Sequence, residues 1–97
     1  MFIIELVYEK SLKAIDAHMG EHMQFLNKHY AAGSFIMSGR KVPRTGGIII
    51  AKCKTKKTLE KIMKQDPFYK QGLATFSIIE FNASQKAENI DELMSDQ

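Results

Sequence analysis

The sequence has a single cysteine, only two prolines and no tryptophan among its 97 residues. The lone Cys53 excludes an internal disulfide and a zinc site built from several thiolates, and we expect a reducing, cytoplasmic location. No apolar run approaches the roughly 18–20 residues that span a bilayer. Glu5 and Glu9 interrupt the first ten residues, so neither a secretory signal nor a membrane partner is expected. The hydrophobic fraction of 44% is enough for one small packed domain.

Charge is unevenly distributed along the chain. Residues 1–83 hold thirteen Lys or Arg against seven Asp or Glu, a net charge of +6, whereas one Lys against four acids gives residues 84–97 a net charge of −3. The net positive charge of residues 1–83 permits attraction to anions, whether a nucleic acid or a small carboxylated substrate. The densest basic run comprises Lys52, Lys54, Lys56, Lys57, Lys61 and Lys64. No aromatic residue interrupts that run, so a solvated helix face is a better interpretation than nucleic-acid binding.

Hydrophobic periodicity predicts four strands and two helices. Apolar residues alternate from Phe2 to Tyr8, as in a strand, and recur every three or four residues from Leu12 to Tyr30, as in a helix. Ser11 is a candidate N-cap of that helix, Gly33 its candidate C-terminal stop, and Gly20 a site for a bend. The remaining predicted elements are strands at 34–38 and 48–53, a helix capped by Thr55 that ends before Pro67, and a strand at 73–81.

The order β-α-β-β-α-β is typical of the ferredoxin-like α+β fold, a four-stranded antiparallel sheet with both helices on one face. The domain is expected to cover residues 1–83, followed by an acidic tail at 84–97. Three consecutive isoleucines, Ile48–Ile50, predict a central strand. The first and last predicted strands are apolar on both faces. On the face that the helices leave uncovered, their apolar residues are Ile3, Val7, Leu73, Ile79 and Phe81. We expect a second copy of the chain to cover that face and form a homodimer.

Three histidines lie on the first predicted helix. His18, His22 and His29 share one side of it with Phe25, about 90° from the centre of the apolar stripe. We therefore expect them on the flank of the helix, where an imidazole with an ordinary pKa of about 6.5 can exchange protons. A partly exposed histidine without a catalytic role is the alternative for each. No metal is expected, because the His18–His22 pair lacks the glutamate of a metalloprotease helix and a third local ligand.

Asp66 and Pro67 follow the second predicted helix. A carboxylate at that end faces the negative end of the helix dipole, which is unfavourable without a compensating partner. Since the two helices lie side by side in the expected fold, a histidine of the first helix is a candidate partner, which Asp66 would orient and make more basic. An ordinary helix-terminating turn is the alternative.

A polar loop connects the second and third predicted strands and begins near Ser38. Arg40 and Arg44 are suited to hold a carboxylate through paired hydrogen bonds. Gly46 and Gly47 would allow the backbone to approach a ligand closely. An ordinary flexible hairpin loop explains the same composition equally well.

Several of these segments together resemble the YciI-like (YCII-related) family of small bacterial proteins. In chain order they are His22–Leu26, Tyr30–Gly33, Met37–Gly39, Pro43–Gly47, and Asp66–Phe68 followed by Gly72. The resemblance implies the dimeric α/β-barrel form of the ferredoxin-like fold and an active-site His–Asp pair, which falls on His22 and Asp66. The tail beyond Ser84 is longer than the usual family ending, and would fold over the cleft or join the dimer contact.

The leading hypothesis is a small dimeric enzyme, an isomerase or a lyase such as a dehydrochlorinase, that needs no cofactor. Some family members and structural relatives resemble muconolactone isomerases and dehydrochlorinases, whereas most have no established activity, so the resemblance does not identify a substrate. In this hypothesis His22, oriented by Asp66, would move a proton on a small anionic substrate that is cyclic or derived from an aromatic compound. The chain has no G-x-G-x-x-G or P-loop motif for a nucleotide cofactor. The rival hypothesis is a non-catalytic ligand-binding or protein-interaction module. The candidate substrate-binding and wall residues are Ser38, Arg40, Arg44, Phe68 and Phe25.

Overall fold

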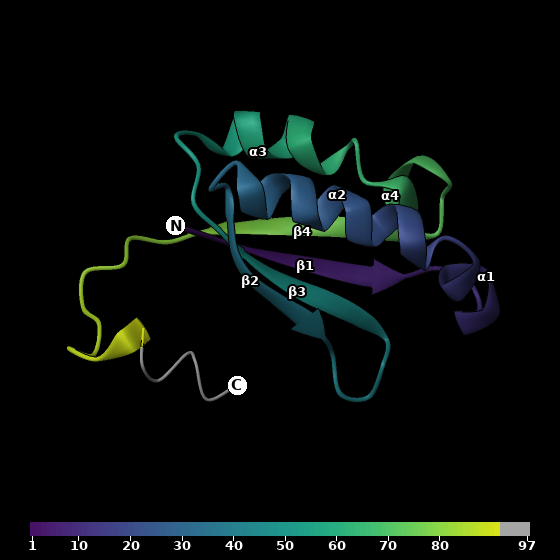
Figure 1. Ribbon diagram of the computed structural model, residues 1–97, viewed down its shortest axis with the longest axis horizontal. Coiled ribbons are helices and arrows are strands. Elements are labelled where there is room, and N and C mark those ends of the chain that lie inside the picture. Colours follow the sequence, from purple (N-terminus) through teal and green to yellow (C-terminus); the bar gives the residue numbers. More distant parts are fainter. Residues whose placement is uncertain (92–97) are drawn as a thin grey trace.

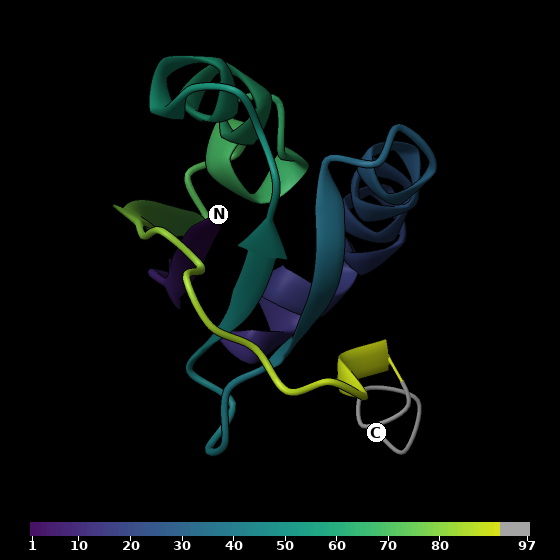
Figure 2. The same cartoon turned by 90° about the vertical axis from the view of Figure 1, so that its left-hand side faces the viewer.

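The computed structural model describes residues 1–91 and contains four strands and four helices within them. In chain order they are β1 (Phe2–Tyr8), α1 (Leu12–Ala17), α2 (Met19–Ala31), β2 (Phe35–Arg40), β3 (Gly46–Ala51), α3 (Lys56–Met63), α4 (Pro67–Lys70) and β4 (Ala74–Glu80). The helices α2, α3 and α4 lie on one side of the sheet (Figures 1 and 2). Within residues 1–91, no helix has the length and apolar character needed to cross a membrane.

The four strands form one antiparallel sheet in the order β2-β3-β1-β4. This order confirms the predicted ferredoxin-like α+β plan. The isoleucine-rich β3 is a central strand, as predicted, and Ile49 pairs with Ile4 of β1. Ile4 and Ile49 face the helices and are 0% and 1% exposed. The edge strand β2 lies beside β3, so its helix-facing side chains lie close to α2.

Local signals set most of the helix ends. The side chain of Ser11 accepts the backbone N–H of Ala14 and caps α1, and Thr55 caps α3 through the N–H of Thr58. Gly33 has a φ of 81°, the left-handed conformation that ends a helix and that glycine adopts without a steric cost. These predicted caps and this stop are confirmed.

The first predicted helix is divided in two at His18. This residue leaves helical geometry with φ −113° and ψ 10°, so the break falls two residues before the bend predicted at Gly20. Ile15 of α1 belongs to the cluster around Phe68, and Met19 at the start of α2 packs against the same cluster. Leu26, farther along α2, belongs to the main core between the helices and the sheet.

The buried side of α2 differs from the predicted apolar stripe. His22, Phe25, Leu26 and His29 are each 6–7% exposed, whereas Met23 of the predicted stripe is 46% exposed. The helix is therefore rotated so that His22 and His29 face inward, and the prediction that these two lie on the flank is wrong. Phe25 draws this side inward by packing against Phe35 of β2, with ring centroids 5.8 Å apart.

Two glycines at the start of β3 allow its backbone to lie close to the neighbouring strands. Gly46 pairs with Val7 of β1, and a Cβ atom there would lie 1.9 Å from the carbonyl oxygen of Leu6. Gly47 also belongs to β3, next to Gly39 of β2. The close approach predicted for these glycines is therefore made to neighbouring backbone within the sheet and not to a ligand site.

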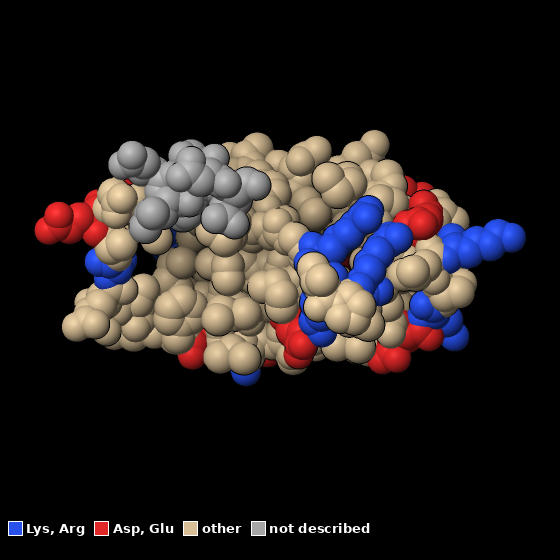
Figure 3. Space-filling view, turned by 90° about the horizontal axis from the view of Figure 1, so that it is seen from below, with Lys and Arg blue, Asp and Glu red and all other residues tan. Residues whose placement is uncertain are grey.

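The face of the sheet turned away from the helices, called the outer face below, is largely apolar. Figure 3 views it and shows a broad area without charged side chains, next to a group of Lys and Arg. Its members by strand register are Ile3, Val7, Met37, Ile48, Ile50 and Ile79. Leu73 was predicted here but is only 7% exposed and packs with Ile15 and Phe68, because β4 begins after it.

The beginning of the acidic tail lies along this outer face. The segment 82–91 runs beneath the sheet (Figure 2) and shares a cavity with Met37 and Ile50. Ile90 is the half-buried residue of the segment. The rest of the predicted tail, residues 92–97, lies outside the described residues.

Candidate active site

A buried contact joins His22 of α2 to Asp66, which precedes α4. His22 Nδ1 lies 2.8 Å from Asp66 Oδ1, although 44 residues separate the two along the chain. Asp66 is 0% exposed and His22 is 7% exposed. A hydrogen bond from a ring N–H to a carboxylate is strong when water is excluded. The structure thus brings together the two residues that the family resemblance singled out.

Asp66 begins α4 and does not end α3. α3 ends at Met63 with Lys64 as its C-cap. Asp66 has extended backbone, its Oδ1 accepts the backbone N–H of Phe68 at 3.0 Å, and Pro67 takes the first helical position. The carboxylate therefore lies where backbone N–H groups are free to donate, which is the opposite of the predicted dipole arrangement. The cause is Pro67, which disfavours helical backbone at Asp66 but starts a new turn well.

Phe68 supports the imidazole from one side. Its ring lies parallel to that of His22, with centroids 4.0 Å apart and planes 4° apart. Phe68 is 1% exposed, so it backs the histidine and does not line the open cavity in front of it. Because Asp66 holds Nδ1 and Phe68 holds the ring plane, His22 is left with Nε2 as its free nitrogen.

His22 lines a cavity of about 430 Å³ between α2 and the helix-facing side of β2, β3 and β1. Most of the wall is apolar, and the polar groups that reach it are few. Such a mixture suits a small ligand with an apolar body and one or two polar groups. The lining residues are Leu6, Tyr8, Met19, His22, Met23, Leu26, Ser38, Arg40 and Ile49, and the cavity is also bordered by Gly39 and Ile48, whose register places them on the opposite face of the sheet.

Ser38 and Arg40 place polar groups on the β2 side of this cavity. Both line it, and their register partners are Ile49 and Gly47 of β3. Residues two apart on a strand share a face, so the hydroxyl and the guanidinium lie on the same side of the sheet as His22. Arg40 has no ion pair within residues 1–91.

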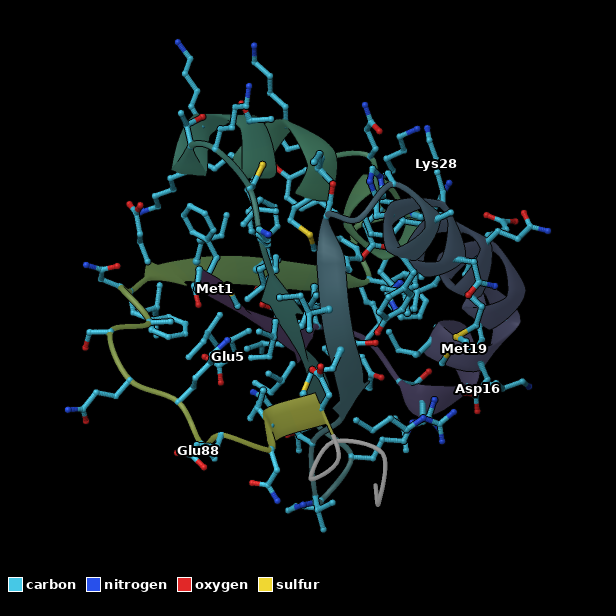
Figure 4. All side chains as sticks on the ribbon, turned by 60° about the vertical axis from the view of Figure 1, so that its left-hand side comes forward. Met1, Glu5, Asp16, Met19, Lys28 and Glu88 are labelled. Carbon is cyan, nitrogen blue, oxygen red and sulfur yellow. The ribbon has the colours of Figure 1, made fainter. Side chains whose placement is uncertain are left out.

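Arg44 does not line the cavity. Its guanidinium forms two hydrogen bonds with Asp16 of α1 and lies 5.9 Å from the centre of the Tyr8 ring. The hydrogen bond to Arg44 lowers the pKa of Asp16 and raises that of Arg44. Asp16 lies near the end of α1, and Figure 4 labels it where α1 meets the start of α2 at Met19. Arg44 therefore ties the loop after β2 to α1, and of the two predicted arginines only Arg40 reaches the cavity.

The other two histidines lie apart from the pair. His18 is half-buried, with Nδ1 3.8 Å from a carboxylate oxygen of Glu21. His29 is 7% exposed and packs between Phe25 and Phe35, with ring centroids at 4.9 Å and 5.2 Å. Among the described residues, no three His, Cys, Asp or Glu side chains are grouped so that they could hold a metal ion.

Several wall residues were not singled out from the sequence. Tyr8 and Leu6 line the cavity from β1, and strand alternation already placed them on the same face as Ile4. Met19 and Met23 line it from α2 because the helix is rotated relative to the predicted stripe. The periodicity gives the faces of each element but not the distance between them, so it could not show that these faces enclose a cavity.

The fold and this site define a ferredoxin-like α+β domain in which a histidine, held by a buried carboxylate, lines an apolar cavity. The family model of the YCII-related domain matches residues 1–82 of this chain. The chain therefore belongs to this family, which confirms the resemblance. No curated protein matches the sequence. A similar solved structure is 5-chloro-2-hydroxyhydroquinone dehydrochlorinase (TftG) from Burkholderia phenoliruptrix AC1100 in complex with 2,5-dihydroxybenzoquinone. It has a TM-score of 0.71 and 17% identity, over 84% of this chain and 94% of that chain, and shows the shared fold.

The buried His29 makes stability depend on pH. Burial lowers the pKa of His29, and the charge of Lys28 lowers it further, so the folded chain binds this proton less readily than the unfolded chain does. Above the ordinary histidine pKa of about 6.5, the ring is neutral in both states and its contribution to the free energy of unfolding is fully present. This contribution is lost as the pH falls from that value through the lower pKa of the folded chain.

We expect urea unfolding of wild type and His29→Phe to reveal this loss. Phenylalanine keeps the aromatic packing with Phe25 and Phe35 but does not titrate. As the pH falls from neutral to about 5, the free energy of unfolding of wild type should fall relative to that of the variant, whose own pH dependence records all other groups. A difference between the two proteins that does not change with pH would contradict this assignment.

Proposed function

We propose that this chain is a small enzyme that moves a proton on a small anionic substrate, either cyclic or derived from an aromatic compound. The reaction class is an isomerisation or an elimination such as dehydrochlorination. The observation that carries the proposal is the contact between His22 and the fully buried Asp66 at the wall of a cavity. A histidine held in one orientation by a carboxylate is a common general base. Membership of the YCII-related family and the dehydrochlorinase that shares the fold support it.

In the proposed step, His22 Nε2 removes a proton from a carbon next to a substrate carbonyl. The electron pair of that C–H bond moves onto the carbonyl oxygen and forms an enolate. In an isomerisation, the enolate takes the proton back at a different carbon. In an elimination, its electrons form a new double bond and chloride leaves the adjacent carbon with the C–Cl bonding pair, while the proton passes from His22 to water. Neither route consumes an oxidant or a reductant.

The remaining wall of the cavity favours this substrate class. Leu6, Leu26 and Ile49 offer apolar contacts to a flat ring, and Arg40 offers a positive charge for a carboxylate or an ionised hydroxyl. The structural relative is named for a chlorinated hydroxyhydroquinone and was solved with a dihydroxybenzoquinone, both of them small oxygenated rings.

Exchanging His22 for Gln tests the proposal. Glutamine keeps a polar side chain of similar size but removes the base. The first probe is 5-chloro-2-hydroxyhydroquinone, whose diketo tautomer has a C–H bond next to a carbonyl and chlorine on the adjacent carbon, and its signal is chloride release. The second probe is muconolactone in D2O, with deuterium incorporation as the signal. We expect turnover of at least one probe by wild type and a loss of about 100-fold or more in kcat for His22→Gln.

Binding measurements separate catalysis from the rival function. Titration calorimetry with 2,5-dihydroxybenzoquinone should give dissociation constants within about threefold for wild type and His22→Gln, because glutamine retains a hydrogen-bonding group. Binding by both proteins without turnover by either would favour the non-catalytic ligand-binding module. Full turnover by His22→Gln would show that His22 is not the catalytic base.

The two arginines provide a matched comparison. Arg40 reaches the cavity without an ion pair among the described residues, whereas Arg44 is held by Asp16. We expect Arg40→Gln to weaken 2,5-dihydroxybenzoquinone binding about tenfold, since a charge-assisted hydrogen bond contributes roughly 1.5 kcal/mol, and Arg44→Gln to leave it nearly unchanged. Calorimetry on both variants measures the difference. Equal weakening by the two substitutions would contradict the placement of Arg40 as the anion-binding group.

We also propose that a second copy of the chain packs on the outer face. Ile79 is 58% exposed there and Met37 is 38% exposed, which leaves apolar area open to water in a single chain. Sedimentation velocity should give a dimer for wild type and a monomer for Ile50→Lys, because a lysine ammonium loses its hydration when that face is covered. Asn27→Lys, on the exposed side of α2, is the charge-matched control and should remain dimeric. A monomeric wild type would rule the proposal out.

A further inference from the structure

The hydroxyl groups of Tyr30 and Ser38 form a hydrogen bond that joins the end of α2 to the edge strand β2. Ser38 lines the cavity beside His22, but Tyr30 does not. Tyr30 is half-buried and packs edge-on against Phe35, with ring centroids 6.2 Å apart and planes at 86°. The tyrosine is therefore fixed by the core, and its hydroxyl touches the one hydroxyl that reaches the cavity from β2.

Either hydroxyl can donate in this hydrogen bond. A phenol is a stronger acid than an aliphatic alcohol, which favours the arrangement in which the Tyr30 hydroxyl donates and Ser38 Oγ accepts. Ser38 then keeps its own hydroxyl hydrogen for a group in the cavity. Accepting a hydrogen bond also polarises the Ser38 hydroxyl and makes it a better donor.

We propose that Ser38, oriented by Tyr30, donates the hydrogen bond that stabilises the negative oxygen formed when His22 removes the substrate proton. This inference rests on the proposed function and assigns a new role to Tyr30, that of a positioning residue which touches Ser38 and not the substrate. The proton stays on Ser38 Oγ throughout. The electron pair released by the C–H bond rests on the substrate oxygen until it returns to carbon or expels chloride.

The placement of the three groups fits this role. His22 is on α2 and Ser38 is on β2, so the base and the donor reach the cavity from different elements. Arg40, two residues beyond Ser38 on the same side of β2, adds a positive charge near the donor. A donor fixed before the reaction stabilises developing charge more effectively than water, which must reorient.

The positioning claim is tested first in the protein without ligand. Three-bond NMR couplings across the Ser38 Cα–Cβ bond should show a single rotamer in wild type and rotamer averaging in Tyr30→Phe, which loses only the phenolic hydroxyl. Tyr69→Phe is the control, because Tyr69 lies on the surface against Phe76 and makes no side-chain hydrogen bond within residues 1–91. A single Ser38 rotamer in Tyr30→Phe would overturn the positioning role, whether or not the chain is an enzyme.

The catalytic claim is tested by a double-mutant cycle on the probe that wild type turns over. We expect kcat to fall about 100-fold in Ser38→Ala and about tenfold in Tyr30→Phe, with KM nearly unchanged in both. The double variant should be no slower than Ser38→Ala, because Tyr30 acts only through Ser38. Losses that multiply, or a change confined to KM, would overturn it. If wild type turns over neither probe, the proposed function fails and the catalytic role of Ser38 fails with it, while the rotamer measurement still decides the role of Tyr30.

Discussion

The carboxylate of Asp66 is removed from water completely, and its need for hydrogen-bond donors organises the site. A buried charge without partners is very costly, and within residues 1–91 the donors are supplied to Oδ1 and not to Oδ2. The backbone N–H of Phe68 and the ring N–H of His22 both donate to Oδ1. One atom thereby fixes the start of α4, the orientation of the imidazole and the contact between α2 and α4. Phe68, carried by the turn that Asp66 caps, then packs flat against the same imidazole.

Ion pairs determine which basic side chain near the cavity is left without an acidic partner among the described residues. Asp16 neutralises Arg44 and draws it toward α1, and Lys41 lies 2.6 Å from Glu5. Arg40 is the cation that lines the cavity, where Ser38 adds a hydroxyl held by Tyr30. His22, Ser38 and Arg40 line the cavity from α2 and β2, two elements joined by the packing of Phe25 on Phe35. The shape of the cavity and the packing of the core are therefore coupled at this edge of the sheet.

The two faces of the sheet have different roles. The helix-facing side is filled by the core and by the cavity, whereas the outer face presents isoleucine and methionine side chains beside the segment 82–91. The family match ends at residue 82, so nearly all of this segment lies outside the matched domain. Residues 82–91 cover the part of the outer face near β2, beside Met37 and Ile50. The apolar area left open on that face is smaller as a result.

The sequence by itself determined the order of the elements, their caps and the strand order that follows from them, because these depend on local conformational preferences and on hydrophobic periodicity. Ser11, Thr55 and Gly33 act at the predicted positions since each works through its own backbone or the next turn. The candidates His22 and Asp66 could be named from the family resemblance, but their contact depends on two elements 44 residues apart. Only the tertiary structure decided the rotation of α2, the contact of the Asp66 carboxylate with His22 and the choice of Arg40 over Arg44. Each of these is a competition among packing, burial and charge that no single segment contains.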